Sequence, residues 1–323
     1  MISIDGSREV RTWKRRLQSS ESFIALECAK DEVAFESEAT VMTEASDKKH
    51  RKQVTRGVLE PEGSAFLRLV WDQEDMCEDE TERRMPSLGK KAPDCLECLG
   101  TVLSLLDRLA SCWWSCQGGD HVIEYIAARA TASSRATLRL FRFGFYDEAL
   151  MLTRSVGEVA NLVFLFHQDR SKLERWRRAS RSTRLAEFSP AKVRRAIEAN
   201  GAAIPIGPER YRRLSDGISH TTPDTRPQDY NGFGMPFVGA VFQEAGAILV
   251  LNELALATAF AAAFLASLAA LPTAPQRRIV SAAKQLAKSV GAVDITTLPG
   301  YWADLRRAPG FQEFSSRMKT AHK

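Results

Sequence analysis

Apolar residues recur at helical spacing through most of the chain after residue 92. From Pro93 the apolar positions are 96, 99, 102, 103, 106, 109, 110, 113 and 114, the period of an amphipathic helix ending near Gly118. The same period, read with the prolines and glycines, predicts further helices at about 121–143, 146–167, 171–199 with a break at Ser189-Pro190, 208–218, 236–271 and 276–290. No stretch of this region keeps the two-residue alternation of a strand. We therefore predict an all-α fold, a helical bundle of about six to seven helices.

The stretch 135–166 contains the most informative pattern. It predicts two helices joined by a turn at Phe143-Gly144-Phe145. The second helix is apolar on nearly every side, which is typical of a helix enclosed by other helices. One line of polar residues interrupts it, here called the polar stripe: Arg154, Glu158 and Asn161.

The polar stripe has two interpretations. Arg154 and Glu158 are four residues apart and can pair on one face of a helix. A buried ion pair with an amide beside it can fix how helices align, which makes the stripe structural. Alternatively, the stripe forms one wall of a polar pocket whose facing residues are Glu253, on the long helix, and His220.

The apolar run from Leu254 to Leu271 is long enough to be compared with a membrane span. It carries no charge, and a bilayer needs about 17–25 such residues. However, it is rich in alanine and follows the polar residues Gln243, Glu244 and Glu253. This context favours a central helix packed through alanine faces, with membrane association as the alternative.

The ends of the chain differ from the bundle. Residues 1–91 are rich in charge, carry an acidic run at 72–82, and predict a poorly ordered or loosely attached extension. Within it, Ala65 to Trp71 is a short apolar piece that fits a strand or a docking segment. Residues 92–292 are predicted to form the bundle domain, and 293–323 a C-terminal tail with short helices.

The composition and the N-terminal residues indicate a cellular compartment and argue against a disulfide-stabilised fold. An apolar content of 44% supports a sizeable core, and the formal net charge is +5. The residues after Met1 are charged, with no continuous apolar segment of a secretory signal. Six cysteines in 323 residues do not suggest a disulfide scaffold, so we expect a cytoplasmic protein.

Two cysteine pairs have spacings found in zinc sites, Cys95-x-x-Cys98 and Cys112-x-x-x-Cys116. Both fall on the helix predicted to start at Pro93, which places Cys98 and Cys112 about 21 Å apart at 1.5 Å per residue. One zinc ion cannot bridge them. We therefore expect packing cysteines, no metal and no cofactor.

A basic segment follows the polar stripe. Guanidinium groups clustered on a helix can neutralise phosphates, and a tryptophan can stack on a base. The residues predicted for nucleic-acid contact are Arg175, Trp176, Arg177, Arg178, Arg181 and Arg184. The alternative is a solvated face whose tryptophan turns inward.

Arg213 and His220 supply a candidate catalytic pair. A histidine titrates near neutral pH and can act as general base, while an arginine can stabilise a phosphoryl transition state. Their spacing resembles the Arg-x(4–6)-His pattern of the HEPN superfamily, helical domains that include metal-independent ribonucleases. The spacing here is at the long end of that pattern and includes Gly217.

Two further sequence elements stand out between residues 93 and 270. The first is an aromatic-glycine turn followed by Arg-Ser-x-x-Glu, at Gly144, Tyr146, Asp147, Ala149, Leu152, Arg154, Ser155 and Glu158. The second is Tyr-x-x-Leu-Ser…His, at Tyr211, Leu214, Ser215 and His220. Together they resemble a family of uncharacterised bacterial all-helical proteins that is distantly HEPN-like, over about residues 93–270. The resemblance implies a helical bundle and no settled activity.

These observations support three functional hypotheses. The first is a non-catalytic interaction or regulatory module of the kind that acts in stress response or phage defence, with a protein partner or a second copy as homodimer. The second is a HEPN-like metal-independent endoribonuclease, with RNA as substrate, His220 as general base and Arg213 at the phosphate. The third is a membrane-associated helical protein through residues 254–271, which the alanine-rich context makes the least favoured.

Overall fold

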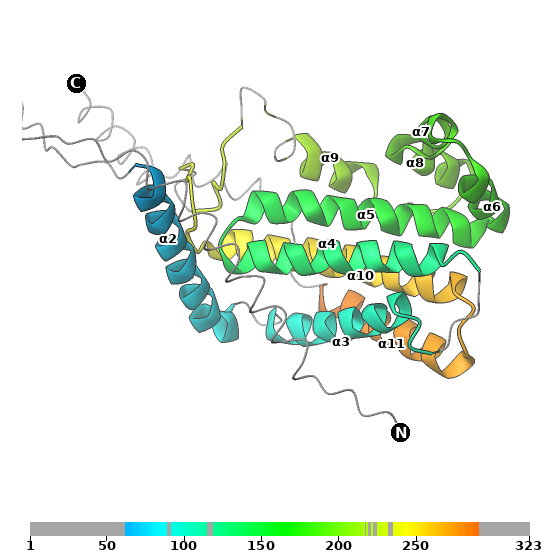
Figure 1. Cartoon of the computed structure of the whole chain (residues 1–323), viewed down its shortest axis with the longest axis horizontal. Coiled ribbons are helices and arrows are strands. Elements are labelled where there is room, and N and C mark those ends of the chain that lie inside the picture. The colour runs from blue at the N-terminus through cyan, green and yellow to red at the C-terminus, as the bar shows by residue number, and fades with distance from the viewer. Residues whose placement is uncertain are drawn as a thin grey trace, which may run out of the picture. The chain divides into compact units, whose positions relative to one another are not determined.

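Helices make up the regular structure of the computed structural model, which describes residues 62–88, 92–114, 119–216, 218, 221, 225–231 and 235–290 (Figure 1). The α-helices are α2 (Gly63–Arg84), α3 (Ala92–Ala110), α4 (Val122–Arg142), α5 (Tyr146–Gln168), α6 (Arg170–Arg178), α7 (Arg181–Phe188), α8 (Pro190–Ala199), α9 (Pro208–Asp216), α10 (Glu244–Leu268) and α11 (Thr273–Ser289). A 3₁₀ turn, η2 (Met85–Ser87), follows α2. These ranges contain ten α-helices and no strand, so the all-α prediction is confirmed, while six to seven helices was too low.

The core is built around α5 and α10, which pack along each other. Figure 1 shows α4 running alongside them, with α3 and α11 below. Every residue of α10 from Ala245 to Leu268 is buried or partly buried. Its many alanines let neighbouring helices approach closely, which explains a helix that is apolar on all sides.

Both α5 and α10 are long and apolar enough to cross a membrane. The most apolar stretch of α5 is 56% buried within the protein, and that of α10 is 67% buried. The core helices of a bundle meet the same criteria of length and composition. The packing of α10 on α3, α4, α5 and α11 buries most of this apolar surface.

The predicted ends of the central helices agree with the structure, and two neighbouring boundaries do not. The turn at Phe143-Gly144-Phe145 joins α4 to α5 as predicted. The long helix begins at Glu244 rather than Pro236, because Gln243 is extended and its backbone N–H donates to the Tyr146 hydroxyl at 3.0 Å. The basic segment contains a second break at Ala179, after which Ser180 caps α7 by accepting a hydrogen bond from the Thr183 amide. This break and the additional helix α2 explain why the structure has more helices than predicted.

The apolar piece from Ala65 to Trp71 belongs to helix α2, not to a strand. α2 falls within the stretch predicted as an extension, and it contacts α4. Cys77 and Thr81 are buried, and Glu78 accepts from Arg139 at 3.0 Å and pairs with Arg142 at 2.9 Å. The C-terminal half of α2 is therefore fixed to the bundle. The predicted tail, 293–323, lies outside the described residues.

Candidate functional site

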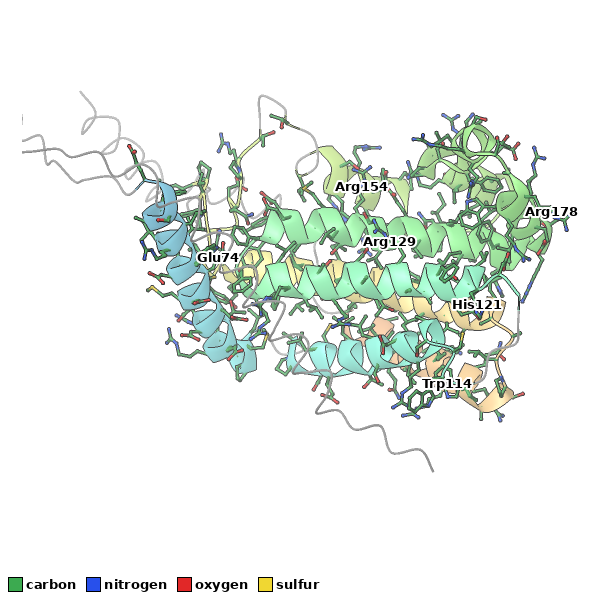
Figure 2. The ribbon with its side chains drawn as sticks, in the orientation of Figure 1. Glu74, Trp114, His121, Arg129, Arg154 and Arg178 are labelled. Carbon is green, nitrogen blue, oxygen red and sulfur yellow. The ribbon has the colours of Figure 1, made fainter. Side chains whose placement is uncertain are left out.

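The polar stripe of α5 is covered by α9. Arg154 Nε lies 3.3 Å from Glu158 Oε1, and the Arg154 guanidinium donates to the Tyr211 hydroxyl at 2.7 Å. The Tyr211 hydroxyl in turn donates to Glu158 at 2.8 Å. Figure 2 shows Arg154 on the side of α5 that faces α9. The three side chains therefore form a closed hydrogen-bonded ring between two helices.

Tyr211 lies against two guanidinium groups. The Arg154 Cζ lies 4.7 Å from the centre of the tyrosine ring, and the Arg194 Cζ lies 4.0 Å from it. Such cation–π contacts contribute roughly 0.5–2 kcal/mol each, depending on desolvation. Burial, and then the neighbouring Glu158, raise the pKa of Tyr211, so its hydroxyl stays a neutral donor.

Asn161 has a different partner. Its side-chain amide donates to the Ile206 carbonyl at 3.0 Å and accepts from the Ile206 N–H at 2.9 Å. The Asn161 side chain thus pairs with both backbone polar groups of Ile206, in the connection 200–207. Gly157 allows Ile206 to approach α5, because a Cβ at residue 157 would lie 3.3 Å from the Ile206 side chain. These bonds join the stripe to α9 and to the connection 200–207.

We expect Asn161→Ala to lower the free energy of unfolding by about 1–3 kcal/mol, because the Ile206 N–H and C=O would lose their partners in a buried position. The comparison is Asn200→Ala, whose side chain is exposed and forms no hydrogen bond to another described residue. The control should stay within about 0.5 kcal/mol of the wild type. Urea unfolding followed by circular dichroism measures both, and equal stabilities would contradict this role.

Glu253 is the other buried charge beneath α9. It is 3% exposed and lies 3.2 Å from Arg210 Nε. Burial raises the pKa of Glu253, and the positive charges of Arg210 and Arg213 oppose that rise. Neighbouring residues of α9, Arg210 and Tyr211, thus bind α10 and α5 respectively.

The stripe also borders an open cavity of about 270 Å³. Glu158 and Asn161 lie on its wall with Arg129, whereas Glu253 is not among its lining residues. This cavity therefore does not bring Glu253 to the stripe. Glu253 reaches α9 rather than the cavity.

The predicted catalytic pair is only half described. Arg213 lies on α9, 4.0 Å from Glu209 and within the electrostatic reach of Glu253. His220 lies outside the described residues, so its distance from Arg213 remains a prediction. The ion pair of Arg213 is thus formed within its own helix.

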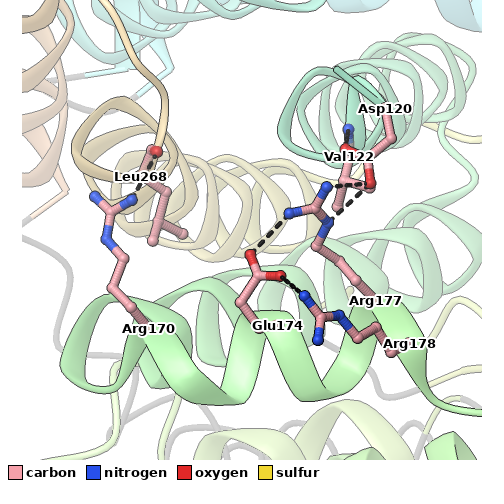
Figure 3. A network of polar contacts seen from close by, with 7 residues as sticks. All are labelled: Asp120, Val122, Arg170, Glu174, Arg177, Arg178 and Leu268. Atoms are coloured by element: carbon pink, nitrogen blue, oxygen red, sulfur yellow. Dashed lines mark hydrogen bonds and ion pairs between the residues drawn. The ribbon is translucent and has the colours of Figure 1, made fainter.

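Ion pairs occupy much of the basic segment. Arg175 forms two bonds to Glu187, at 3.1 and 2.7 Å. Arg177 donates to Asp120 at 2.8 Å and to Glu174 at 2.7 Å, as Figure 3 shows. Hydrogen bonds from Arg177 lower the pKa of Asp120. With Arg178, which lies 3.8 Å from Glu174, three of the six predicted nucleic-acid residues are thus paired with acids.

Trp176 and the remaining arginines complete this surface. Trp176 is partly buried against Phe166, with ring centres 5.7 Å apart, as the inward alternative expects. Arg178 is 84% exposed and lies 3.8 Å from Glu174. Arg181 and Arg184 are exposed, and neither forms an ion pair within the described ranges.

The cysteines are not all on one helix, because α3 ends at Ala110. Cys95 is buried among core residues of α3, as expected for a packing cysteine. Cys112 follows the helix, and its Sγ lies 3.5 Å from His121 Nδ1. Cys116 lies outside the described residues.

Comparison with known proteins adds no family. No family model, no curated protein and no solved structure matches this chain. The HEPN-like resemblance therefore remains a prediction.

Proposed function

We propose that this protein is a non-catalytic interaction module that binds a basic amphipathic helix of a partner protein. The proposed docking site is a groove between α2 and residues 235–243, here called the α2 groove. Its exposed apolar lining, edged by acids, is the observation that carries the proposal.

The α2 groove has a volume of about 530 Å³. Its α2 wall includes Met76, which is 71% exposed, and its other wall includes Val238, which is 96% exposed. Phe237 and Val241 add further exposed apolar surface to the same wall. Contiguous exposed apolar surface marks interaction sites, because leaving it in water is unfavourable.

The apolar face of α2 continues beyond the groove. Phe66 and Leu69 precede Gln73 and Met76 at intervals of three to four residues, so they lie on the same face of the helix. Phe66 is 50% exposed and Leu69 is 42% exposed. An extended apolar stripe with an adjoining groove fits an amphipathic helix, which docks through residues at the same intervals.

The acidic residues of α2 favour a positively charged partner. Asp72, Asp75 and Asp79 are exposed on α2 and pair with no other described residue. Glu78, by contrast, is already bound to Arg139 and Arg142 of α4. Unpaired carboxylates beside an apolar groove favour a partner with lysine or arginine on its polar edge, and they speed its association.

The polar stripe supports a non-catalytic role. Arg154, Glu158 and Tyr211 satisfy one another, and Asn161 is bonded to the backbone of Ile206. Groups bound in this way hold helices together and have few remaining donors or acceptors for a substrate.

The test uses the full-length protein and a fluorescent Leu/Lys amphipathic helical peptide, with a Leu/Glu peptide of the same pattern as reference. We expect anisotropy to show binding of the basic peptide only. Met76→Asp and Val238→Asp should each weaken it by about 10-fold or more, the effect of losing a hot-spot contact. Leu185→Asp is the control, because Leu185 is 64% exposed on α7, outside the groove. Equal weakening by all three variants would contradict the proposed site.

A ribonuclease remains the second candidate, favoured by the exposed guanidiniums of Arg178, Arg181 and Arg184. It predicts that the purified protein cleaves single-stranded RNA in the presence of a chelator. His220→Ala should then abolish cleavage and leave the circular dichroism spectrum unchanged. Such cleavage would replace the non-catalytic proposal.

A further inference from the structure

Three side chains with metal-binding atoms meet at the end of the bundle where α3 is followed by α4. Cys112 lies beyond the C-terminus of α3, His121 precedes α4, and Glu124 lies in its first turn. Their ligand atoms, Sγ, a ring nitrogen and a carboxylate oxygen, all lie within 4.8 Å of one another. Figure 2 shows His121 at this end of α4.

From this arrangement we propose that Cys112, His121 and Glu124 bind a divalent transition metal ion of the zinc class. Thiolate, imidazole and carboxylate are the ligands that zinc takes in proteins. This site is independent of the α2 groove, and none of the three residues lines that groove.

The distance between two of the donors fits tetrahedral coordination. Zinc bonds of about 2.3 Å to sulfur and about 2.0–2.1 Å to nitrogen place the two atoms roughly 3.5 Å apart at a tetrahedral angle. Cys112 Sγ and His121 Nδ1 are 3.5 Å apart. A metal ion can therefore enter between them with little movement of either side chain.

The backbone turns both of these residues toward the site. Cys112 has φ 54° and His121 has φ 51°, left-handed conformations that are uncommon outside glycine. Among the described non-glycine residues only Gln228 shares this conformation. Unfavourable backbone conformations of this kind cluster where side chains must be positioned for function.

An open cavity gives the ion access and a fourth position. Cys112, His121 and Glu124 all line a cavity of about 280 Å³. Three protein ligands with one open position are the arrangement of zinc sites that bind water or a small ligand. The fourth ligand would therefore come from the cavity.

Three arginines line this cavity, Arg108, Arg170 and Arg177, and the last two are bonded to other partners. Arg108 lies over the Trp113 ring, with its Cζ 5.6 Å from the ring centre. Arg177 is bonded to Asp120 and Glu174, and Arg170 donates to the carbonyls of Ser267 and Leu268 at 2.8 and 3.3 Å. Figure 3 shows the bonds of Arg177 and the bond from Arg170 to Leu268. Acidic partners offset the charge of Arg177, which reduces the repulsion that a metal cation would meet.

The first test is Co²⁺ binding to the full-length wild-type protein after chelation. A tetrahedral site with one cysteine gives visible d–d bands together with a thiolate-to-cobalt charge-transfer band. We expect both bands, saturation at one ion per chain, and their loss when Zn²⁺ displaces Co²⁺. Absence of the charge-transfer band in the folded wild-type protein would overturn the proposal without any variant.

The second test assigns the ligands. Cys112→Ser should remove the charge-transfer band, and His121→Ala should weaken Zn²⁺ binding by at least about 100-fold, since even groups behind the ligands contribute about 10- to 100-fold. Glu124→Gln should also weaken binding. Cys98→Ser is the matched control, because Cys98 is a partly buried cysteine of α3 outside this cluster. Retention of the band in Cys112→Ser, or its loss in Cys98→Ser, would overturn the assignment.

Discussion

Arg210→Ala is expected to destabilise the protein by about 3 kcal/mol, near the low end of the cost of removing one partner from a buried ion pair. Glu253 is 3% exposed, so the substitution leaves its carboxylate without the guanidinium 3.2 Å away. Arg213 remains near Glu253 and limits the loss. Urea unfolding in mildly alkaline buffer measures the change in the free energy of unfolding.

The loss should depend on pH in a defined direction. Burial raises the pKa of Glu253 above its ordinary value of 4.5, so the folded state binds a proton more tightly than the unfolded state. Stability from this group is therefore complete below pH 4.5 and is lost as the pH rises through the folded pKa. Removing Arg210 raises the folded pKa further. The difference between variant and wild type should be largest at high pH and shrink as the pH falls toward 4.5.

Two further variants separate charge from packing. Arg210→Ala combined with Glu253→Gln should recover much of the lost stability, because no buried charge is then left alone. Arg212→Ala removes an exposed arginine of the same helix and should change stability by less than about 0.5 kcal/mol. A loss that is independent of pH, or equal in Arg212→Ala, would contradict the role of the pair.

The parts of the fold that local sequence determines were predictable. The turn around Gly144 lies between two long helical periods, and α4 and α5 end within a residue or two of the predicted limits. The Arg154–Glu158 pair follows from their spacing on one helix. The buried position of Glu253 follows from a helix that is apolar on all sides.

The partners of these residues were not predictable, because they come from distant segments. Tyr211 completes the polar stripe from α9, which begins at Pro208, whereas α5 ends at Gln168. The start of α10 depends on a bond between Gln243 and Tyr146, which no local pattern shows. The Cys112–His121 contact was missed because the apolar period of α3 continues past Ala110, where the helix ends. The sequence signal for this cluster was Cys112 followed, after the pair Gly118-Gly119, by His121 and Glu124.

Gly144→Ala is expected to lower the free energy of unfolding by about 2–5 kcal/mol. The alanine would have to adopt a left-handed backbone conformation, and its Cβ would clash with neighbouring atoms. Gly144 has φ 77°, and a Cβ there would lie 2.8 Å from Cys77 Sγ and 2.8 Å from the Val241 carbonyl oxygen. Both contacts belong to the walls of the α2 groove. The substitution should therefore loosen α2 as well as destabilise the protein.

Gly201→Ala isolates the backbone contribution. Gly201 has φ 72° and no atom within 4 Å of an added Cβ. The alanine should therefore lower the free energy of unfolding only by the cost of a left-handed backbone, about 1–2 kcal/mol. The excess loss in Gly144→Ala then measures the close approach of α2 and residue 241 to the turn between α4 and α5. Hydrogen exchange should be faster in α2 of Gly144→Ala and unchanged in α2 of Gly201→Ala. Equal losses and unchanged α2 exchange in both variants would mean that the groove walls do not rest on this turn.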